Sequence, residues 1–271
     1  MKPLLIVQAD DAGVHPAIDR GILRGVDEGP VTSVGVVVAG ETASSFARSL
    51  TERPEVGVGL HFALTGVPAL ASTRLGEPGQ PMPSTWRGLA RRLATGAVTR
   101  DDIWVELTAQ IQRAEAFGLA IDHLGAHNHI HLLPGIADIF ARLASVFQLP
   151  RRVRVSRTPG LEFLRDRRAV ALRAASSFAR RTAWRDFKTP DRVVGIADLG
   201  GVHDLSRVAG AVSPRFRSIE LIVHPGDQPL SSEPPLPPWD FDWVGELEAL
   251  LSTPWRTILA ASYTLGTYLD L

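Results

Sequence analysis

Short apolar runs recur along the chain, and a polar or titratable residue follows almost every one of them. The runs are compact and rich in Val, Leu and Ile, which is typical of strands in an α/β protein. We therefore predict strands at Leu4–Ala9, Val31–Val38, Val56–Leu60, Ala120–Leu124, Arg152–Val155, Val193–Ile196 and Ser218–Val223. In parallel α/β folds the active site forms where such strands end, so the polar residues at these positions are candidate site residues.

Helical patterns connect some of these strands. The segment from Ala17 to Glu28 separates the first two strands and completes a βαβ unit, and Arg165 to Arg185 reads as a solvated helix with one apolar stripe. The length of 271 residues fits one large α/β barrel. We predict a single domain over residues 1–271 with a (β/α) barrel-like fold, either an incomplete barrel or a seven-stranded TIM-type barrel.

Two segments rich in Pro and Gly interrupt the pattern. The first, Pro68 to Ser84, comes after His61, and the second, Pro225 to Pro238, comes directly after His224. Both are predicted to be long loops. Because each loop follows a strand end, we expect the two to leave the same face and to form walls of one pocket.

Composition narrows the function classes. Lys plus Arg equals Asp plus Glu at 29 each, so no net positive field attracts nucleic acid or an anionic membrane. The chain has no Cys, which excludes thiol nucleophiles and cysteine-bound zinc, so a metal would be held by His and carboxylates. No apolar run is long enough for a signal peptide core or a membrane span. We expect a cytoplasmic protein without nucleic-acid or membrane partners.

A pair of carboxylates, Asp10 and Asp11, follows the first predicted strand. Adjacent side chains of a strand point to opposite sides unless the chain turns, and Gly13 would permit such a turn. Two carboxylates at one strand end suit a division of labour, in which one binds a metal and the other acts as general base. The alternative is that one of them caps the following helix, for which Asp is a favoured residue.

Histidines supply the strongest local signal. Four of the eight lie within nine residues, at positions 123, 127, 129 and 131, and the last three would share one side of an extended segment. Such a group of imidazoles is costly to bury unless it binds a cation or is fully hydrogen-bonded. Two more histidines, His61 and His224, each end a predicted strand. Alone each would more often be structural, but their shared placement makes both candidates for the same site.

In their order and spacing over nearly the whole chain, these motifs resemble the YdjC/ChbG-like carbohydrate deacetylases. The motifs are Ala9-Asp10-Asp11-Ala12-Gly13, Val31-Thr32-Ser33, Gly59-Leu60-His61, Ala126-His127-Asn128-His129-Ile130-His131-Leu132-Leu133-Pro134 and Val223-His224-Pro225-Gly226. The resemblance implies an α/β-barrel-like fold and a hydrolase that removes the acetyl group from an N-acetylated sugar, in a manner similar to the NodB-type deacetylases.

The resemblance also implies roles for individual residues. Asp11, His61 and His127 would hold one divalent metal ion, Zn²⁺ or Mg²⁺, which activates water and polarises the amide carbonyl. Asp10 would be the general base, and His224 the general acid or a stabiliser of the transition state.

Other candidates have less defined roles. His129 would be a supporting group or a further ligand, and Arg157 is the candidate for a substrate contact, whereas His123 and His131 are expected to be structural. Two alternative functions stay open: another metal-dependent hydrolase such as a phosphoesterase, and a non-catalytic protein that binds metal or sugar. The oligomeric state is also open, with a homodimer as one option.

The chain departs from the family pattern at three positions. Ala12 replaces the usual aromatic residue after the Asp pair, and Asp19 stands where the first helix often has Asn. Gly125 replaces an Asp that commonly lies two residues before the first His of the cluster. That change would remove a carboxylate able to orient a metal ligand, so it bears on metal affinity.

Overall fold

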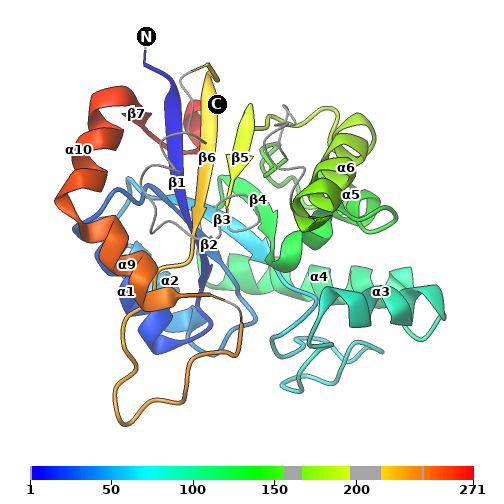
Figure 1. The fold of residues 1–271 in the computed structure, drawn as a ribbon. Helices are drawn as coiled ribbons and strands as arrows, with labels where there is room; N and C mark the ends of the chain where they lie inside the picture. Colours follow the sequence, from blue (N-terminus) through cyan, green and yellow to red (C-terminus); the bar gives the residue numbers. More distant parts are fainter. Residues whose placement is uncertain (1, 156–166, 196–214, 240) are drawn as a thin grey trace.

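A computed structural model describes residues 2–155, 167–195, 215–239 and 241–271 (Figure 1). Its strands belong to one parallel sheet with the order β4-β3-β2-β1-β6-β5, and β7 pairs with the beginning of β1. The strands are β1 (Leu4–Ala12), β2 (Ser33–Val36), β3 (Gly57–Phe62), β4 (His123–Ala126), β5 (Arg192–Val194), β6 (Ser218–Val223) and β7 (Thr264–Leu265). Parallel neighbours require crossovers, and helices supply most of them.

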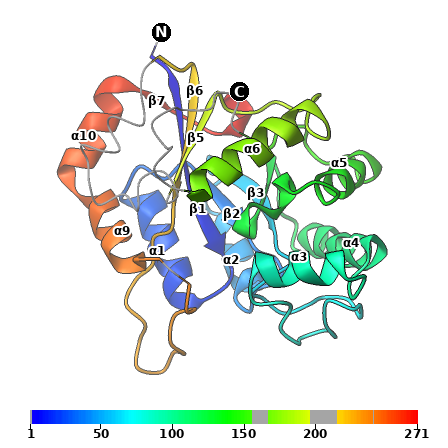
Figure 2. The ribbon, with the colours of Figure 1, turned by 45° about the vertical axis from the view of Figure 1, so that its right-hand side comes forward.

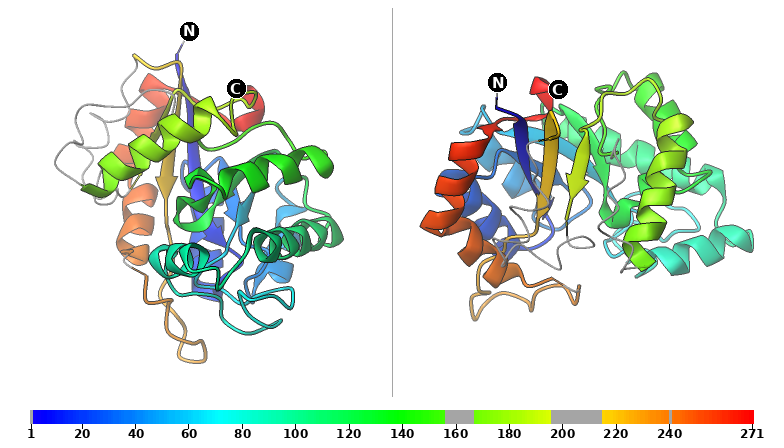
Figure 3. Two further views of the ribbon diagram at one scale, coloured as in Figure 1. Left: turned by 90° about the vertical axis from the view of Figure 1, so that its right-hand side faces the viewer. Right: turned by 45° about the horizontal axis from the view of Figure 1, so that its top comes forward.

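Helices pack around the outside of the curled sheet (Figures 2 and 3). They are α1 (Pro16–Asp27), α2 (Ala43–Leu50), α3 (Trp86–Ala94), α4 (Arg100–Ala116), α5 (Ala137–Val146), α6 (Arg167–Arg181), α9 (Trp243–Leu251) and α10 (Thr253–Ser262), with short 3₁₀ helices η1 (His127–Leu132) and η2 (Tyr268–Asp270). None of the helices in the described ranges is long and apolar enough to span a bilayer.

The sheet curls into a half-barrel, and a closed TIM-type barrel is not confirmed. In the described residues, two isolated bridges, Leu124–Val153 and Arg152–Lys188, are the pairings recorded beyond the β4 edge. The strand predicted at Arg152–Val155 is therefore reduced to bridging residues. The other predicted strands are found, with β1, β3 and β4 running past their predicted ends and Ile196 lying outside the described residues.

The two faces of the sheet differ in chemistry because side chains alternate along a strand. On β1, Leu5, Val7 and Ala9 belong to the apolar core, whereas Gln8 and Asp10 lie on the opposite, inner face. The same alternation brings the buried polar side chains Ser33, His61, His123 and Glu220 to the inner face from β2, β3, β4 and β6. The curled sheet thus encloses a polar interior, which is where a buried site can form.

Candidate metal and catalytic site

A bulge at the end of β1 brings the two adjacent carboxylates to one side. The pairing of β1 with β2 shifts register between Ala9 and Ala12, and Asp11 has a left-handed φ of 66°. This conformation is uncommon for a residue other than Gly and is concentrated at functional sites. As a result both carboxylates approach His61: Asp10 Oδ1 lies 3.7 Å from Nδ1, and Asp11 Oδ1 lies 3.5 Å from Nε2. The turn expected at Gly13 begins two residues earlier.

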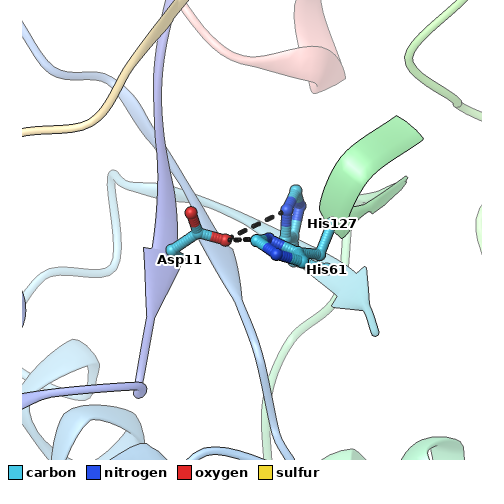
Figure 4. A group of neighbouring side chains, drawn as sticks. All are labelled: Asp11, His61 and His127. Atoms are coloured by element: carbon cyan, nitrogen blue, oxygen red, sulfur yellow. Dashed lines mark hydrogen bonds and ion pairs between the residues drawn. The ribbon is translucent and has the colours of Figure 1, made fainter. Parts of the chain in front are cut away.

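Asp11, His61 and His127 converge from three elements: β1, β3 and the first residue of η1 (Figure 4). Each offers one ligand atom, and these atoms lie within 4.8 Å of one another. Asp11 Oδ1 is 2.9 Å from His127 Nδ1. All three residues are buried. A carboxylate and two imidazoles at this spacing can hold a divalent ion.

The electrostatics of this cluster suit a cation. Burial lowers the pKa of His61 to about 4, although both aspartates oppose the shift, so the imidazole is neutral and able to bind a metal. Burial would raise the pKa of Asp11, but the neighbouring histidines hold it below its usual value, so it is ionised. Asp11 Oδ2 is buried with no hydrogen-bond donor among the described residues. An orphaned carboxylate oxygen in a buried site fits a metal ligand, because leaving it unmatched would be costly.

Asp10 is held by Arg154, a residue that sequence reasoning missed. Arg154 donates from Nη1 to Asp10 Oδ2 at 2.5 Å and from Nη2 to Oδ1 at 2.7 Å, and both side chains are almost fully buried. Burial would raise the pKa of Asp10, but this guanidinium, helped by His61, holds it well below its usual range. The sequence does indicate this residue through the alternation of Arg and Val in Arg152-Val153-Arg154-Val155, which places Arg154 on the face opposite the two apolar side chains. Arg157, the predicted substrate contact, lies outside the described residues.

His224 lies at the edge of the cluster, just past β6. Its Nε2 is 4.0 Å from Asp11 Oδ2, its ring stacks on Phe241 at 3.9 Å between centroids, and its backbone N–H donates to Glu246 Oε2 at 2.5 Å. The following turn is wedged against α1, where a side chain at Gly21 would lie 2.4 Å from the Cα of Gly226. His224 is thus fixed by its backbone and by ring stacking, with its ring near the candidate ligands.

The histidines at 127, 129 and 131 do not share one side, because this segment is not extended. Residues 127–132 form η1, and Asn128 and His129 both have left-handed φ values, 56° and 52°. The turn brings His127 to Asp11 and His61, leaves His129 partly exposed, and buries His131, whose Nε2 is 2.8 Å from the backbone oxygen of Arg154. His123 lies on β4 beneath the cluster and is hydrogen-bonded to Asp122.

The segment that follows the second Pro-rich loop lies beside this cluster. Trp239, directly after Pro238, lies against His127, with ring centroids 4.4 Å apart and an interplanar angle of 39°. A side chain at Gly66, in the turn before the first loop, would approach the same indole to 3.3 Å. Both predicted loops are free of helices and strands and extend from the same end of the sheet (Figure 1).

Comparison with known proteins decides the family. The sequence profile described as "YdjC-like protein" matches residues 4–261. The chain belongs to the YdjC-like family.

Relatives of this YdjC-like chain carry deacetylase names. It is 31% identical to a chitooligosaccharide deacetylase of Proteus mirabilis (strain HI4320), with both chains covered completely. It is 30% identical to a carbohydrate deacetylase of Mus musculus over 82% of this chain and 77% of that one. A solved structure from Enterococcus faecalis V583, described as a candidate cellobiose-phosphate cleavage protein, has a TM-score of 0.75 at 19% identity and covers 100% of this chain and 99% of its own. At that identity it is similar in fold alone.

Gly125 stands where the resemblance to the family implies an Asp. A side chain built at Gly125 would begin 3.3 Å from His61 Nδ1 and 3.9 Å from Arg154 Cζ. A carboxylate at this position would therefore reach both groups. In this chain Asp10 faces both groups: its Oδ1 lies 3.7 Å from His61 Nδ1, and its Oδ2 lies 2.5 Å from Arg154 Nη1. Asp10 thus occupies the space between His61 and Arg154 that a carboxylate at position 125 would also reach.

The second departure, Asp19, provides a pH-dependent prediction. Its Oδ1 accepts a hydrogen bond from the backbone N–H of Gly13 at 2.7 Å, and burial raises its pKa to about 7, which this hydrogen bond only partly opposes. The native state therefore binds this proton more tightly than the unfolded chain does, so the stabilisation is complete below about pH 4 and is lost as the pH rises to about 7.

An Asp19→Asn substitution keeps the acceptor and removes the charge. We expect its advantage in unfolding free energy over the parent to grow by roughly 2–3 kcal/mol between pH 5 and pH 8. Urea unfolding of both proteins at the two pH values measures this difference. A gap that does not change with pH would show that Asp19 is ionised in the native state throughout.

Proposed function

We propose that this chain is a metal-dependent hydrolase that removes the acetyl group from an N-acetylated sugar, and that its 271 residues form one deacetylase domain. The observation that carries the proposal is the buried group of Asp11, His61 and His127 beside an ionised Asp10, within a chain whose relatives are named deacetylases. The ion would be Zn²⁺ or Mg²⁺: two imidazoles favour zinc, and a shell completed by waters suits magnesium.

The residues around the cluster divide the work of amide hydrolysis. A bound divalent ion would supply Lewis acidity, which acidifies water and polarises the acetamide carbonyl. Asp10 would accept the proton of the attacking water. Its low pKa makes it a weak acceptor that is always ionised, which is adequate for an acidified water. His224, whose Nε2 lies 4.0 Å from Asp11 Oδ2, would donate a proton to the departing amine.

Trp239 is the group best placed to receive the sugar ring. It is only partly buried although it lies against His127, and Phe241, two residues later, is also partly buried and stacks on His224. Two partly exposed aromatic side chains therefore border the cluster. Aromatic faces bind apolar faces of ligands through their large contact area.

For a Trp239→Ala variant we expect KM for an N-acetylated oligosaccharide to rise roughly tenfold, the loss of about 1.4 kcal/mol of contact energy, with metal affinity unchanged. Steady-state kinetics measure the effect, and the matched control is Trp86→Ala, which removes an exposed indole on α3. Equal KM values in the parent and the Trp239 variant would show that Trp239 does not bind the sugar ring.

The experiment that tests the function is acetate release from N-acetylglucosamine and its oligomers. The protein would be assayed after chelation and again after Zn²⁺, Mg²⁺ or Mn²⁺ is restored. We expect release that disappears with the chelator and returns with one of the ions. Release of phosphate from phosphorylated sugars in place of acetate would favour the phosphoesterase alternative. Binding of metal and sugar without any product would favour the non-catalytic one.

A further inference from the structure

A chain of hydrogen bonds runs from Asp10 into the polar interior of the half-barrel and ends on a tyrosine. Arg154, which binds Asp10, also donates from Nε to Glu220 Oε1 at 2.8 Å. The hydroxyl of Tyr268, in η2, donates to the other oxygen of Glu220 at 2.5 Å. We call Asp10, Arg154, Glu220 and Tyr268 the relay. None of the four residues is more than 3% exposed.

The relay holds two carboxylates and one guanidinium, so its charges do not cancel. Arg154 gives its two terminal nitrogens to Asp10 and only its Nε to Glu220. Buried carboxylates need donors for both oxygens, and an unmatched one competes for any nearby cation. The Tyr268 hydroxyl donates to the Glu220 oxygen that the Arg154 Nε does not contact. Both terminal nitrogens of Arg154 therefore bind Asp10.

Tyr268 is itself firmly placed. Its ring stacks on His123, with centroids 4.0 Å apart and planes 5° from parallel, and His123 is fixed by its hydrogen bond to Asp122. Gly59 on the neighbouring strand makes room for this imidazole, because a side chain there would lie 2.3 Å from His123 Nε2. Thr267 and Asp270 form a reciprocal capping box at the N-terminus of η2. The phenol therefore has little freedom to leave Glu220.

We propose that Tyr268 is a positioning residue for Asp10 and acts on it through the two charged side chains between them. The inference rests on the proposed function, in which Asp10 is the base. Without the hydroxyl, Glu220 Oε2 loses the donor that it has among the described residues, and the carboxylate draws the guanidinium toward itself. Asp10 then loses one of its two hydrogen bonds from Arg154 and turns away from the orientation in which it faces the cluster.

A Tyr268→Phe variant tests the proposal, because it deletes the hydroxyl and retains the stacked ring. We expect kcat for acetate release to fall roughly tenfold, with KM and metal affinity changed by less than about twofold. The chain contains one other tyrosine, Tyr263 at the end of α10, so Tyr263→Phe is a matched control and should keep the parental kcat. A parental kcat in Tyr268→Phe would overturn the proposal.

A double-mutant cycle with Asp10→Asn separates positioning from a general structural effect. If Tyr268 acts through Asp10, Tyr268→Phe should lower kcat in the parent but have no further effect on the residual rate of Asp10→Asn. The same cycle measured by urea unfolding should be non-additive, although the hydroxyl and the carboxylate do not touch. Additive effects in both measurements would overturn the proposal.

The unfolding cycle also distinguishes the two hypotheses. If the parent protein releases no acetate with any restored metal, the proposed function fails. The unfolding free energies still report whether Tyr268 and Asp10 are coupled. Coupling without acetate release supports the positioning and rejects the reaction, whereas acetate release without coupling rejects the positioning alone.

Discussion

A His127→Ala variant should lose both its tightly bound metal and nearly all of its acetate release. His127 supplies one of three candidate ligands, and its Nδ1 lies 2.9 Å from the carboxylate of Asp11. Removing a supporting partner of a metal ligand already costs about 10- to 100-fold in affinity, so we expect loss of a ligand to cost more than about 100-fold. Metal content after dialysis, together with kcat, measures both effects.

His129→Ala is the matched control for this variant, since it makes the same change two residues along the same turn. His129 lies outside the group of atoms that converge in the described site, and it is partly exposed. We expect it to keep its metal. Loss of metal from His129→Ala, with metal retained in His127→Ala, would show that His129 binds the ion and His127 does not.

An Asp10→Asn variant should keep its metal and lose most of its turnover, by about 10²- to 10⁴-fold in kcat, the usual contribution of a general base. The amide cannot accept the proton, but it keeps nearly the same shape beside His61 and Arg154. It also leaves Arg154 with Glu220 as its charged partner, so a lower unfolding free energy is expected as well.

Metal affinity decides between two roles for Asp10. The carboxylate faces Nδ1 of His61 at 3.7 Å, so a role in orienting that ligand is the competing explanation. A base alone leaves metal affinity intact when it is mutated, whereas an orienting group does not. Asp19→Asn serves as the control, because it removes another buried carboxylate near β1 and should leave turnover unchanged. Near-parental turnover in Asp10→Asn would end the base assignment.

The sequence predicted where most of the strands lie and which polar residues follow them. The apolar runs located β1, β2, β3, β4 and β6 to within a few residues, because burial in a parallel sheet demands continuous apolar sequence. Since the carboxyl ends of parallel strands gather at one edge, Asp11 and His61 could be expected to meet there. His127 could be added from the resemblance, which supplied its role.

What the sequence could not give depends on local backbone turns and long-range pairing. The left-handed φ of Asp11 and the turn at Asn128 and His129 decide which side chains face the cluster, and no periodicity encodes them. Among the described residues, Arg154 stands on a segment that pairs through isolated bridges, so alternation could place it on one face but could not identify Asp10 as its partner. Nor does spacing reveal that a loop rich in Pro would lay Trp239 against His127.

The order of strands in the sheet bears on how the site is assembled during synthesis. From β4 to β1 each strand pairs with its neighbour in sequence, whereas β6 joins the far side of β1 only after more than half of the chain has been made. The three candidate ligands all precede residue 128, but Arg154, Glu220 and Tyr268 come later. Because domains emerge from the N-terminus first, the ligands emerge before the residues that hold Asp10. A nascent chain would thus be able to bring its three candidate ligands together before it makes the residues that hold Asp10.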